Sequence, residues 1–438
     1  MSELCRLHTE DLVAFHQRAI ERYTAYAKLG LRLDLTRGKP SPEQLDLSNA
    51  LLELPGRTDH ISAEGGDCRN YYGDLRGLPE ARALFSGMLG APVEQCLVGG
   101  NSSLALMHDA IVYALLHGVP ESRAAWSAEG PIAFLCPSPG YDRHFAICEA
   151  YGIRMIPVAL TGHGPDMAMV ERLVGDDPSI KGMWCVPKYS NPTGEIYSDE
   201  TVERLASMRT AAPDFRLFWD NAYAVHHLTE KRHDIANIID ACARHGHADR
   251  ALVFASTSKI TFAGAGLALF ASSKENLSWF TRHMGRRTIG ADKLNQLRHV
   301  RMLRDAQGLA ALMERHRQLL VPKFRAVDEI FAELLGGTGA ASWTKPEGGY
   351  FVSLNVAQGC AKRVVDLGRA AGIAMVSAGQ TFPYGRDPQD SNIRIAPSFA
   401  PVAEVKEAAR GVALSVLRAA AEKLLRERGV TLNQADRK

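Results

Sequence analysis

The stretch PIAFLCPSPGYDRHFAICEAYGIRMIPVAL, residues 131–160, is typical of a strand, a helix and a second strand in succession. Its apolar runs lie at 131–137 and 153–160, and the amphipathic segment between them ends at Gly152. Further strands are expected at 180–187, 215–220 and 250–256, and further helices at 167–175 and 198–210, with Ser198 and Thr201 as candidate caps. We therefore predict an α/β fold in which helices cover both faces of a mostly parallel sheet.

The pattern changes after about residue 290. One long helical pattern covers 292–335, with a kink expected at Pro322, because proline disrupts a helix interior. Short strands are then expected at 348–356 and 391–397, with a helix at 361–372 and a last helix from about Pro401. We predict an N-terminal segment (1–55) that packs on the small domain, a large domain (56–300) and a smaller α+β domain (301–438).

The composition indicates an ordinary globular protein. The 438 residues are 46% hydrophobic and 23% charged, and 51 Lys and Arg nearly balance 49 Asp and Glu. This balance argues against a nucleic-acid or membrane surface. The start, MSELCRLHTEDL, shows no apolar signal region, and no uninterrupted apolar stretch is long enough to span a bilayer. A cytoplasmic enzyme without a disulfide framework is expected.

Candidate binding residues follow the expected strands, where an α/β sheet places its ligands. The turn Gly-Gly-Asn-Ser-Ser, 99–103, precedes a helix and suits a phosphate, although Asn101 or Ser102 could equally be an ordinary helix cap. Tyr141 could stack on a planar ligand or pack its ring on the core. The sequence Asn-Pro-Thr-Gly at 191–194 is a good turn in its own right.

Three charged residues extend this series. Asp220 ends an apolar strand, where a carboxylate is costly unless it is paired, and Tyr223 follows three residues later. Lys259, in the sequence Ser-Thr-Ser-Lys, could be a desolvated nucleophile or base, or a solvated loop residue. Arg394 lies within a strand of the second domain and could bind a carboxylate or form a peripheral salt bridge.

These motifs, in this order, resemble the class I/II pyridoxal-phosphate aminotransferases of fold type I. The motifs are Asn-Pro-Thr-Gly, Asp-x-Ala-Tyr and Ser-x-Ser-Lys, and the resemblance extends from LTRGKP (35–40) to the final helix. The opening DLTRGKPSPEQLDLS (34–48) is similar to a MocR-like branch that contains aspartate aminotransferases. The resemblance implies a homodimer with shared active sites that transfers an amino group, from aspartate to 2-oxoglutarate, in a ping-pong cycle.

The resemblance also implies a role for each site residue. Lys259 would bind the cofactor as an aldimine and then move the substrate Cα proton. The other roles are: Asp220 at the pyridinium nitrogen, with His144 behind it; Tyr223 and Asn191 at the phenolic oxygen; Tyr141 stacked on the ring; Asn101, Ser102, Ser103, Ser256 and Ser258 at the phosphate, with Tyr72 reaching it in the neighbouring subunit; Arg394 and the Gly38 backbone at the substrate carboxylate.

The sequence departs from the family in one place. Many relatives carry an arginine about eight residues after the lysine, as a partner for the phosphate, whereas ITFAGAGLAL (260–269) has no cation. A distal substrate carboxylate would need a further cation, for which the candidates are Arg37, Lys39, Arg286 and Arg287.

Other functions remain open from the sequence. A lyase or decarboxylase could use the same scaffold, because fold and cofactor do not fix which Cα bond breaks. A cofactor-sensing transcription regulator would need a DNA-binding domain, and only about thirty residues precede LRLDLTRGKP. The histidines in AVHHL and HGH make a weak case for a metal. No metal is expected.

Overall fold

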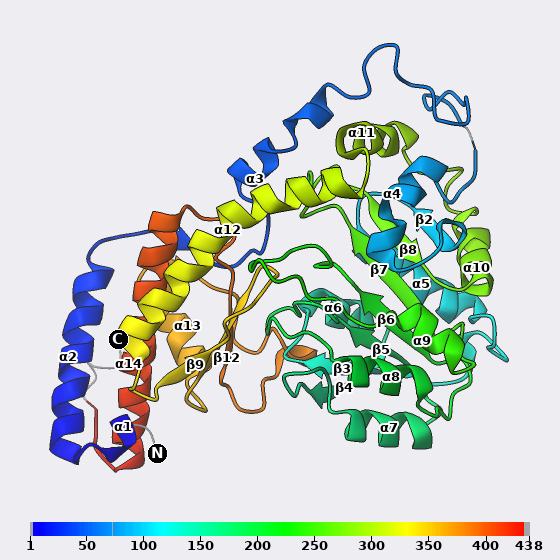
Figure 1. Ribbon diagram of the computed structural model, residues 1–438. Helices are drawn as coiled ribbons and strands as arrows, with labels where there is room; N and C mark the ends of the chain where they lie inside the picture. Colours follow the sequence, from blue (N-terminus) through cyan, green and yellow to red (C-terminus); the bar gives the residue numbers. More distant parts are fainter. Residues whose placement is uncertain (1–2, 72, 433–438) are drawn as a thin grey trace. The chain divides into compact units, whose positions relative to one another are not determined.

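The computed structural model describes residues 3–71 and 73–432, and the chain forms two compact units (Figure 1). The first unit comprises Met1–Ser41, Asn191–Gly194 and Leu319–Lys438. The second comprises Pro42–Ser190 and Glu195–Gln318. The domain boundaries expected after residues 55 and 300 stay predictions.

The second unit is built on a seven-stranded sheet. Its strands, in spatial order, are β2 (Cys96–Val98), β8 (Ala268–Ala271), β7 (Ala251–Ser256), β6 (Arg216–Asp220), β5 (Ile180–Cys185), β3 (Ala133–Ser138) and β4 (Arg154–Ala159). All neighbours pair in parallel except β8, which is antiparallel to both β7 and β2. The predicted α/β fold with a mostly parallel sheet is confirmed, whereas β2 and β8 were not expected from the sequence.

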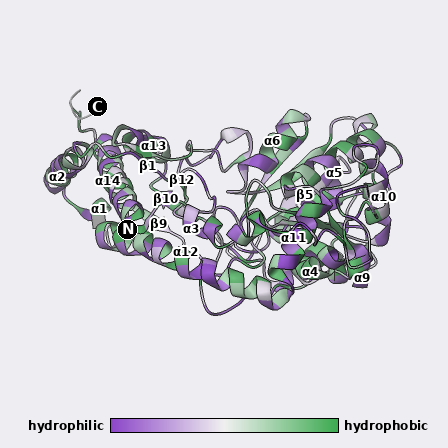
Figure 2. Ribbon diagram, turned by 90° about the horizontal axis from the view of Figure 1, so that it is seen from above, coloured by the Kyte–Doolittle hydropathy of each residue, from purple (hydrophilic) through white to green (hydrophobic). Residues whose placement is uncertain are grey.

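Apolar side chains bury both faces of this sheet. Along β6, Leu217 and Trp219 join one hydrophobic cluster and Phe218 joins another, as the two-residue period of a strand requires. Figure 2 shows hydrophilic and hydrophobic residues alternating along the helices of this unit. The helices of this unit are α3 (Pro42–Asp46), α4 (Pro79–Leu89), α5 (Ser103–His117), α6 (Asp142–Ala150), α7 (Met167–Asp176), α8 (Asp199–Ser207), α9 (Ile238–Arg244), α10 (Lys274–Met284), α11 (Lys293–Leu303) and the start of α12 (Ala306–Leu335).

Local sequence explains where several of these helices begin and end. Ser198 caps α8 by accepting a hydrogen bond from the Thr201 amide at 3.1 Å, so this predicted cap is confirmed. Thr201 is not a cap, because its hydroxyl donates to the His163 carbonyl at 2.9 Å. Helix α6 ends at Ala150, close to the end that the sequence predicted at Gly152, and Gly152 adopts a φ of 65°.

The long helix predicted at 292–335 is wrong as a single element. Helix α11 ends at Leu303, where Arg304 adopts a φ of 66°, and α12 then continues through Pro322. Asp305 starts the new helix, since its Oδ1 accepts hydrogen bonds from the amides of Gln307 and Gly308. Position 308 must be glycine here, because a Cβ would lie 1.8 Å from the carbonyl oxygen of Leu303.

The first unit contains both helices and strands. Among them are the strands expected at 348–356 and 391–397 and the helices expected at 361–372 and from about Pro401. Its strands are β1 (Leu33–Asp34), β9 (Ala341–Trp343), β10 (Val352–Val356), β11 (Ile373–Ala374) and β12 (Asn392–Ile395). Its helices are α1 (Glu3–Arg6), α2 (Thr9–Ala27), α13 (Ala361–Ala370), α14 (Val402–Glu427) and the end of α12. Strand β10 pairs antiparallel with β9 and β12, and α2 packs on α14 through Leu12, Ala421 and Leu425.

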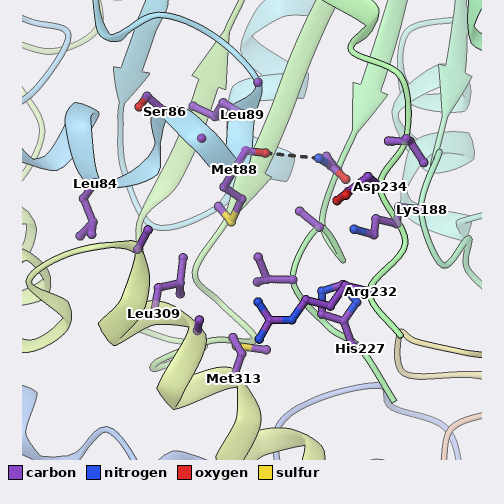
Figure 3. Close-up of a pocket in the computed structure, with 18 of the residues that line it drawn as sticks. Leu84, Ser86, Met88, Leu89, Lys188, His227, Arg232, Asp234, Leu309 and Met313 are labelled. Atoms are coloured by element: carbon purple, nitrogen blue, oxygen red, sulfur yellow. Dashed lines mark hydrogen bonds between the residues drawn. The ribbon is translucent and has the colours of Figure 1, made fainter. Parts of the chain in front are cut away.

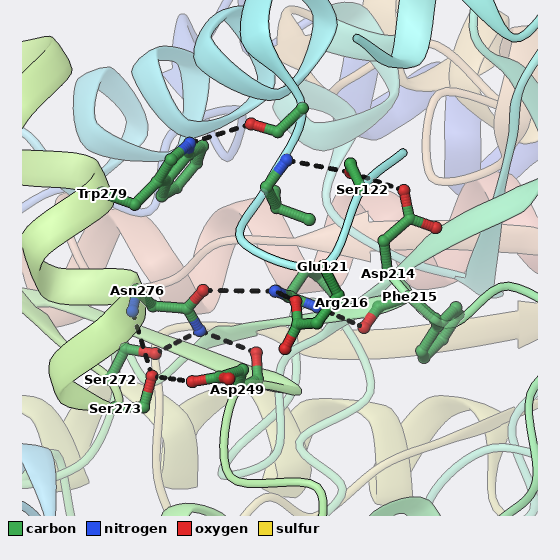
Figure 4. A network of polar contacts seen from close by, with 12 residues as sticks. Glu121, Ser122, Asp214, Phe215, Arg216, Asp249, Ser272, Ser273, Asn276 and Trp279 are labelled. Carbon is green, nitrogen blue, oxygen red and sulfur yellow. Dashed lines mark hydrogen bonds and ion pairs between the residues drawn. The ribbon is translucent and has the colours of Figure 1, made fainter. Parts of the chain in front are cut away.

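A network of buried charges lies at the amino ends of β5 and β6 (Figure 4). The Asp214 carboxylate accepts hydrogen bonds from the Lys181 ammonium at 2.7 Å, the Ser122 hydroxyl at 2.6 Å and the Trp126 indole at 2.8 Å. Beside it, Arg216 pairs with Glu121. Burial alone would raise the pKa of Asp214, but the hydrogen bonds from Lys181 and Ser122 lower it below its usual value.

Candidate active site

The opposite, carboxyl edge of the sheet brings together two turns that are distant in the sequence. Since β8 runs antiparallel to both neighbours, β2 and β7 point the same way, and the turns that follow them meet. The Ser258 hydroxyl donates to the Asn101 carbonyl at 3.2 Å, and the Asn101 amide donates to the Gly264 carbonyl at 3.1 Å. Ser256 lies 3.3 Å from Ser258, so these four residues form one polar group.

The amino end of α5 adjoins this group and is open. Ser102 occupies the cap position with extended backbone, but its side chain makes no capping hydrogen bond, and Ser103 begins the helix. The ordinary helix-cap interpretation of Asn101 and Ser102 is therefore wrong. The first amides of a 15-residue helix, together with nearby hydroxyls, are well suited to a phosphate.

Lys259 lies in the turn after β7, and its Nζ is 5.0 Å from the centre of the Tyr223 ring. Desolvation by the surrounding protein lowers the pKa of the Lys259 amine, while the nearby Asp220 carboxylate opposes this effect. A lysine with a lowered pKa loses its proton more readily at neutral pH, and it can then act as a nucleophile or a base.

Asp220 ends β6 and is 96% buried, with a relative exposure of 4%. Its Oδ2 lies 3.1 Å from the His144 Nε2, but its Oδ1 has no hydrogen-bond partner among the described residues. A buried carboxylate oxygen without a partner is costly, and a cationic N–H, such as a protonated pyridine, would satisfy it. The residue therefore fits a pyridoxal ring.

Aromatic rings hold His144 in place. Its imidazole stacks on Trp184 with ring centres 4.3 Å apart and planes 7° apart, and the Tyr141 ring meets it edge-on at 5.0 Å. The sequence did not indicate a role for Trp184. Its place in β5, one residue from the strand end, was the available signal, but an inward tryptophan is an ordinary core residue.

Two histidines support the backbone of the lysine turn and were also missed. The His226 Nε2 lies 3.3 Å from the Lys259 carbonyl oxygen, and the His316 Nε2 lies 2.9 Å from that of Ile260. Burial lowers the pKa of both, to about 4 for His316, so both rings are neutral at pH 7. A neutral imidazole close to Lys259 adds no charge to the site.

A second group of predicted site residues lies in the first unit. The Arg394 Nη1 of β12 lies 3.5 Å from the Asn191 Oδ1, and its guanidinium lies 4.9 Å from the centre of the Phe351 ring. Gly38 lies against the same ring, because a Cβ at position 38 would be 2.3 Å from the Phe351 Cζ. Phe351 was missed by the sequence, since its partners are distant along the chain.

The remaining predicted residues have mixed outcomes. Tyr72 lies outside the described residues. Arg287 forms an ion pair with Asp109 at 2.9 Å, and the Lys39 Nζ lies 3.9 Å from the Phe399 ring centre. Leu267, eight residues after Lys259, is buried, and its amide donates to the Thr257 hydroxyl. Among residues 3–71 and 73–432, no group of three or more His, Cys, Asp and Glu could hold a metal ion.

Known proteins match the chain over most of its length. The family described as aspartate amino-transferase matches residues 7–428. The chain belongs to this family. The aspartate aminotransferase of Corynebacterium glutamicum is 48% identical over 413 residues, which cover 94% of this chain and 95% of that protein. The crystal structure of an aspartate transaminase from the same species has a TM-score of 0.94 and 47% identity, and covers 97% of this chain and 99% of that one.

The fold is shared more widely. The α-aminoadipate aminotransferase LysN from Thermus thermophilus, complexed with N-(5'-phosphopyridoxyl)-L-leucine, has a TM-score of 0.71 at 19% identity and covers 94% of this chain and 98% of its own. The predicted resemblance to fold type I aminotransferases is confirmed, and the protein is an aminotransferase. The MocR-like branch stays a prediction. In the part of the chain that the structure describes, no helix of this aminotransferase is long and apolar enough to cross a membrane.

Proposed function

We propose that this aminotransferase uses pyridoxal phosphate to move the amino group of L-aspartate to 2-oxoglutarate. The observation that carries the cofactor is the Asp220 carboxylate, which has one oxygen on His144 and a buried second oxygen without a partner among the described residues. The similarity to the C. glutamicum aspartate aminotransferase supports the substrates. The homodimer and the cytoplasmic location expected from the sequence stay predictions.

The residues of the second unit would hold the cofactor. Asp220 would bind the ring nitrogen through Oδ1, while Tyr141 would stack on the ring and Tyr223 would bind its phenolic oxygen. The open α5 end and the hydroxyls would bind the phosphate, for which the residues are Asn101, Ser102, Ser103, Ser256 and Ser258. Because 260–269 holds no cation, the helix dipole and these neutral donors take the place of the arginine that many relatives carry.

The chain's own groups then handle the proton. Pyridoxal phosphate, when bound, supplies an electron sink for negative charge at the substrate Cα. The Lys259 Nζ, with its lowered pKa, would accept the Cα proton and would deliver it to the C4′ carbon of the bound cofactor. His144 keeps Asp220 oriented at the other side, and the neutral His226 and His316 hold the carbonyl groups of the lysine turn.

The residues of the first unit would bind the substrate. Arg394 presents a planar fork of donors that matches an α-carboxylate, and its guanidinium lies 4.9 Å from the centre of the Phe351 ring. Asn191 would contact the phenolic oxygen and the substrate, and the Gly38 backbone would lie beside the carboxylate. For a distal carboxylate, Arg37 remains a candidate from the sequence, since Arg287 is paired with Asp109 and the Arg286 Nη1 lies 3.3 Å from the His283 Nδ1.

A half-reaction tests this proposal. The purified protein, loaded with pyridoxal phosphate and mixed with aspartate, should change its visible spectrum, and 2-oxoglutarate should restore it with release of glutamate. A panel of amino donors should then give aspartate the highest kcat/KM. The absence of a spectral change with every amino acid would overturn the assignment, and ammonia or pyruvate released without an acceptor would identify a lyase instead.

A further inference from the structure

Helix α12 contributes side chains to two different environments in the second unit. Leu309 and Met313 line a cavity of about 1150 Å³ beside Trp219, whose walls carry both carboxylates and cations (Figure 3). His316, further along the helix, does not line this cavity and is fully buried, with a relative exposure of 0%. A buried imidazole needs hydrogen-bond partners within the protein for its ring nitrogens.

His316 has such a partner on each ring nitrogen. Its Nε2 lies 2.9 Å from the carbonyl oxygen of Ile260, which directly follows Lys259. Its Nδ1 lies 2.8 Å from the Nε2 of Gln44, a fully buried residue of the short helix α3. One imidazole ring therefore joins the turn that carries Lys259 to the segment that follows LTRGKP near the start of the chain.

The chemistry of the partners fixes the direction of these two hydrogen bonds. A carbonyl oxygen can only accept, so the His316 Nε2 must carry a proton to bond to Ile260. Burial lowers the pKa of His316 to about 4, so the ring is neutral at pH 7 and carries only this one proton. Nδ1 is then an acceptor, and the carboxamide N–H of Gln44 is the donor that it requires.

His299 of α11 contacts the same turn with the opposite ring tautomer. Its Nδ1 lies 2.7 Å from the Asn295 carbonyl oxygen and must donate, so its Nε2 accepts from the Thr261 hydroxyl at 2.9 Å. Burial lowers the pKa of His299 to about 4 as well. Two neutral imidazoles with different tautomers therefore hold the turn without adding a charge beside Lys259.

We propose that Gln44 is a positioning residue of the aminotransferase reaction: its carboxamide holds His316 as the Nε2–H tautomer, and His316 fixes the peptide that follows Lys259. The inference rests on the proposed role of Lys259 as the group that moves the substrate proton. A group that transfers a proton must be held close to its target, and a small displacement lowers the rate. Gln44 is not among the residues proposed to bind the cofactor or the substrate, so it acts through His316.

The first test measures the hydrogen bonds of His316 by solid-state NMR on the enzyme loaded with pyridoxal phosphate. Histidine is labelled with ¹⁵N and the isoleucine carbonyl with ¹³C, and the correlation with Ile260 identifies the His316 Nε2. We expect a proton on Nε2 and a hydrogen-bonded, unprotonated Nδ1. Gln44→Met should shift the Nδ1 signal towards that of a free nitrogen and leave the His299 signals unchanged. A native His316 protonated on Nδ1, or a His316 spectrum unchanged in Q44M, would overturn the proposal.

Kinetics distinguish a positioning role from a loss of stability. Gln44→Met should lower kcat about tenfold and leave the KM for aspartate within about twofold of the native value. Gln318→Met is the matched control, because Gln318 lies two residues after His316 on the same helix but is exposed. This variant should keep the native kcat. A native kcat in Q44M, or an equal loss in both variants, would refute the role of Gln44.

A double-mutant cycle tests whether Gln44 acts through His316. His316→Gln supplies an amide N–H in place of Nε2–H and needs no fixed tautomer, so adding Gln44→Met to it should lower kcat by less than about twofold. A tenfold loss in both backgrounds would contradict the proposed route. If H316Q does not fold, the Nδ1 signal of Q44M decides. The tautomer is measured without substrate, so its outcome is independent of whether the native enzyme transaminates aspartate.

Discussion

Strand β6 has a buried carboxylate at each end, Asp214 just before it and Asp220 as its last residue, and the two carboxylates differ in their hydrogen-bond partners. Asp214, at the amino end, accepts hydrogen bonds from Lys181, Ser122 and Trp126. Asp220, at the carboxyl end, has one oxygen on His144 and a second, buried oxygen without a partner among the described residues. Asp214, whose carboxylate has several hydrogen-bond donors, therefore stabilises the scaffold. Asp220, which has a buried oxygen without a partner among the described residues and lies close to the desolvated Lys259, is available for a ligand.

The largest effect is expected at the carboxyl end, on removal of the lysine. Lys259→Ala should lower turnover roughly 10³-fold or more, because it removes both the covalent attachment and the proton carrier. It should also abolish the visible absorbance of the cofactor bound to the lysine. Absorption spectra and steady-state rates measure both. Turnover near the native rate would refute the assignment of Lys259.

The next effect tests the unsaturated carboxylate directly. Asp220→Asn keeps the shape but removes the charge that would stabilise a protonated ring nitrogen, so kcat should fall roughly 10²- to 10³-fold. Asp214→Asn is the matched control, because it makes the same change at the other end of the strands and should leave kcat near the native value. Equal losses of kcat in the two variants would remove the distinction between the two ends.

The third effect concerns stability at the amino end. Asp214→Asn leaves the buried Lys181 with a weaker set of partners and should lower the free energy of unfolding by roughly 3 kcal/mol. The folded pKa of Asp214 is lowered, so its contribution is present above the unfolded pKa and is lost as pH falls through the folded value. The difference between native and variant melting temperatures should therefore shrink below about pH 4. A constant difference from pH 7 to pH 3 would contradict the assigned charge.

The smallest effect sharpens the comparison within the active site. His144→Phe keeps a ring on Trp184 but removes the hydrogen bond to Asp220, so kcat should fall about tenfold with little change in KM. His144→Asn should recover part of the rate if its amide reaches the carboxylate. A KM effect without a kcat effect would show that His144 acts on substrate binding rather than through Asp220.

The sequence predicted those features that are encoded locally. The period of the apolar runs predicted five strands and three helices between 131 and 256 in the right order, but it missed α9 (Ile238–Arg244). Ser198 and Gly152 marked helix ends correctly. The break between α11 and α12 was misplaced, because proline gives a strong local signal, whereas the interruption depends on an unusual Arg304 backbone and a close approach of Gly308 to Leu303.

The site could be predicted only as a series of residues. Their order along the chain indicated Lys259, Asp220 and Arg394, but the supporting contacts join positions far apart in the sequence. Trp184 beneath His144, His316 at the Ile260 carbonyl and Phe351 beside Arg394 are ordinary core residues until the fold brings their partners together. The contact between Gln44 and His316 is of the same kind, since it joins positions 272 residues apart.

Strand β8 carries none of the candidate site residues, yet the site depends on it. Its four residues are apolar and buried, and it runs antiparallel to both of its neighbours, β7 and β2. Two successive antiparallel pairings leave β2 and β7 pointing in the same direction. Because β8 is antiparallel to both, β2 and β7 run in the same direction, and the turns that follow them bring Asn101 beside Ser258. The segment 257–267 connects β7 to β8, which runs back along the sheet between β7 and β2. The apolar composition of β8 is ordinary, but its position between β7 and β2 is required for the turns after those two strands to meet.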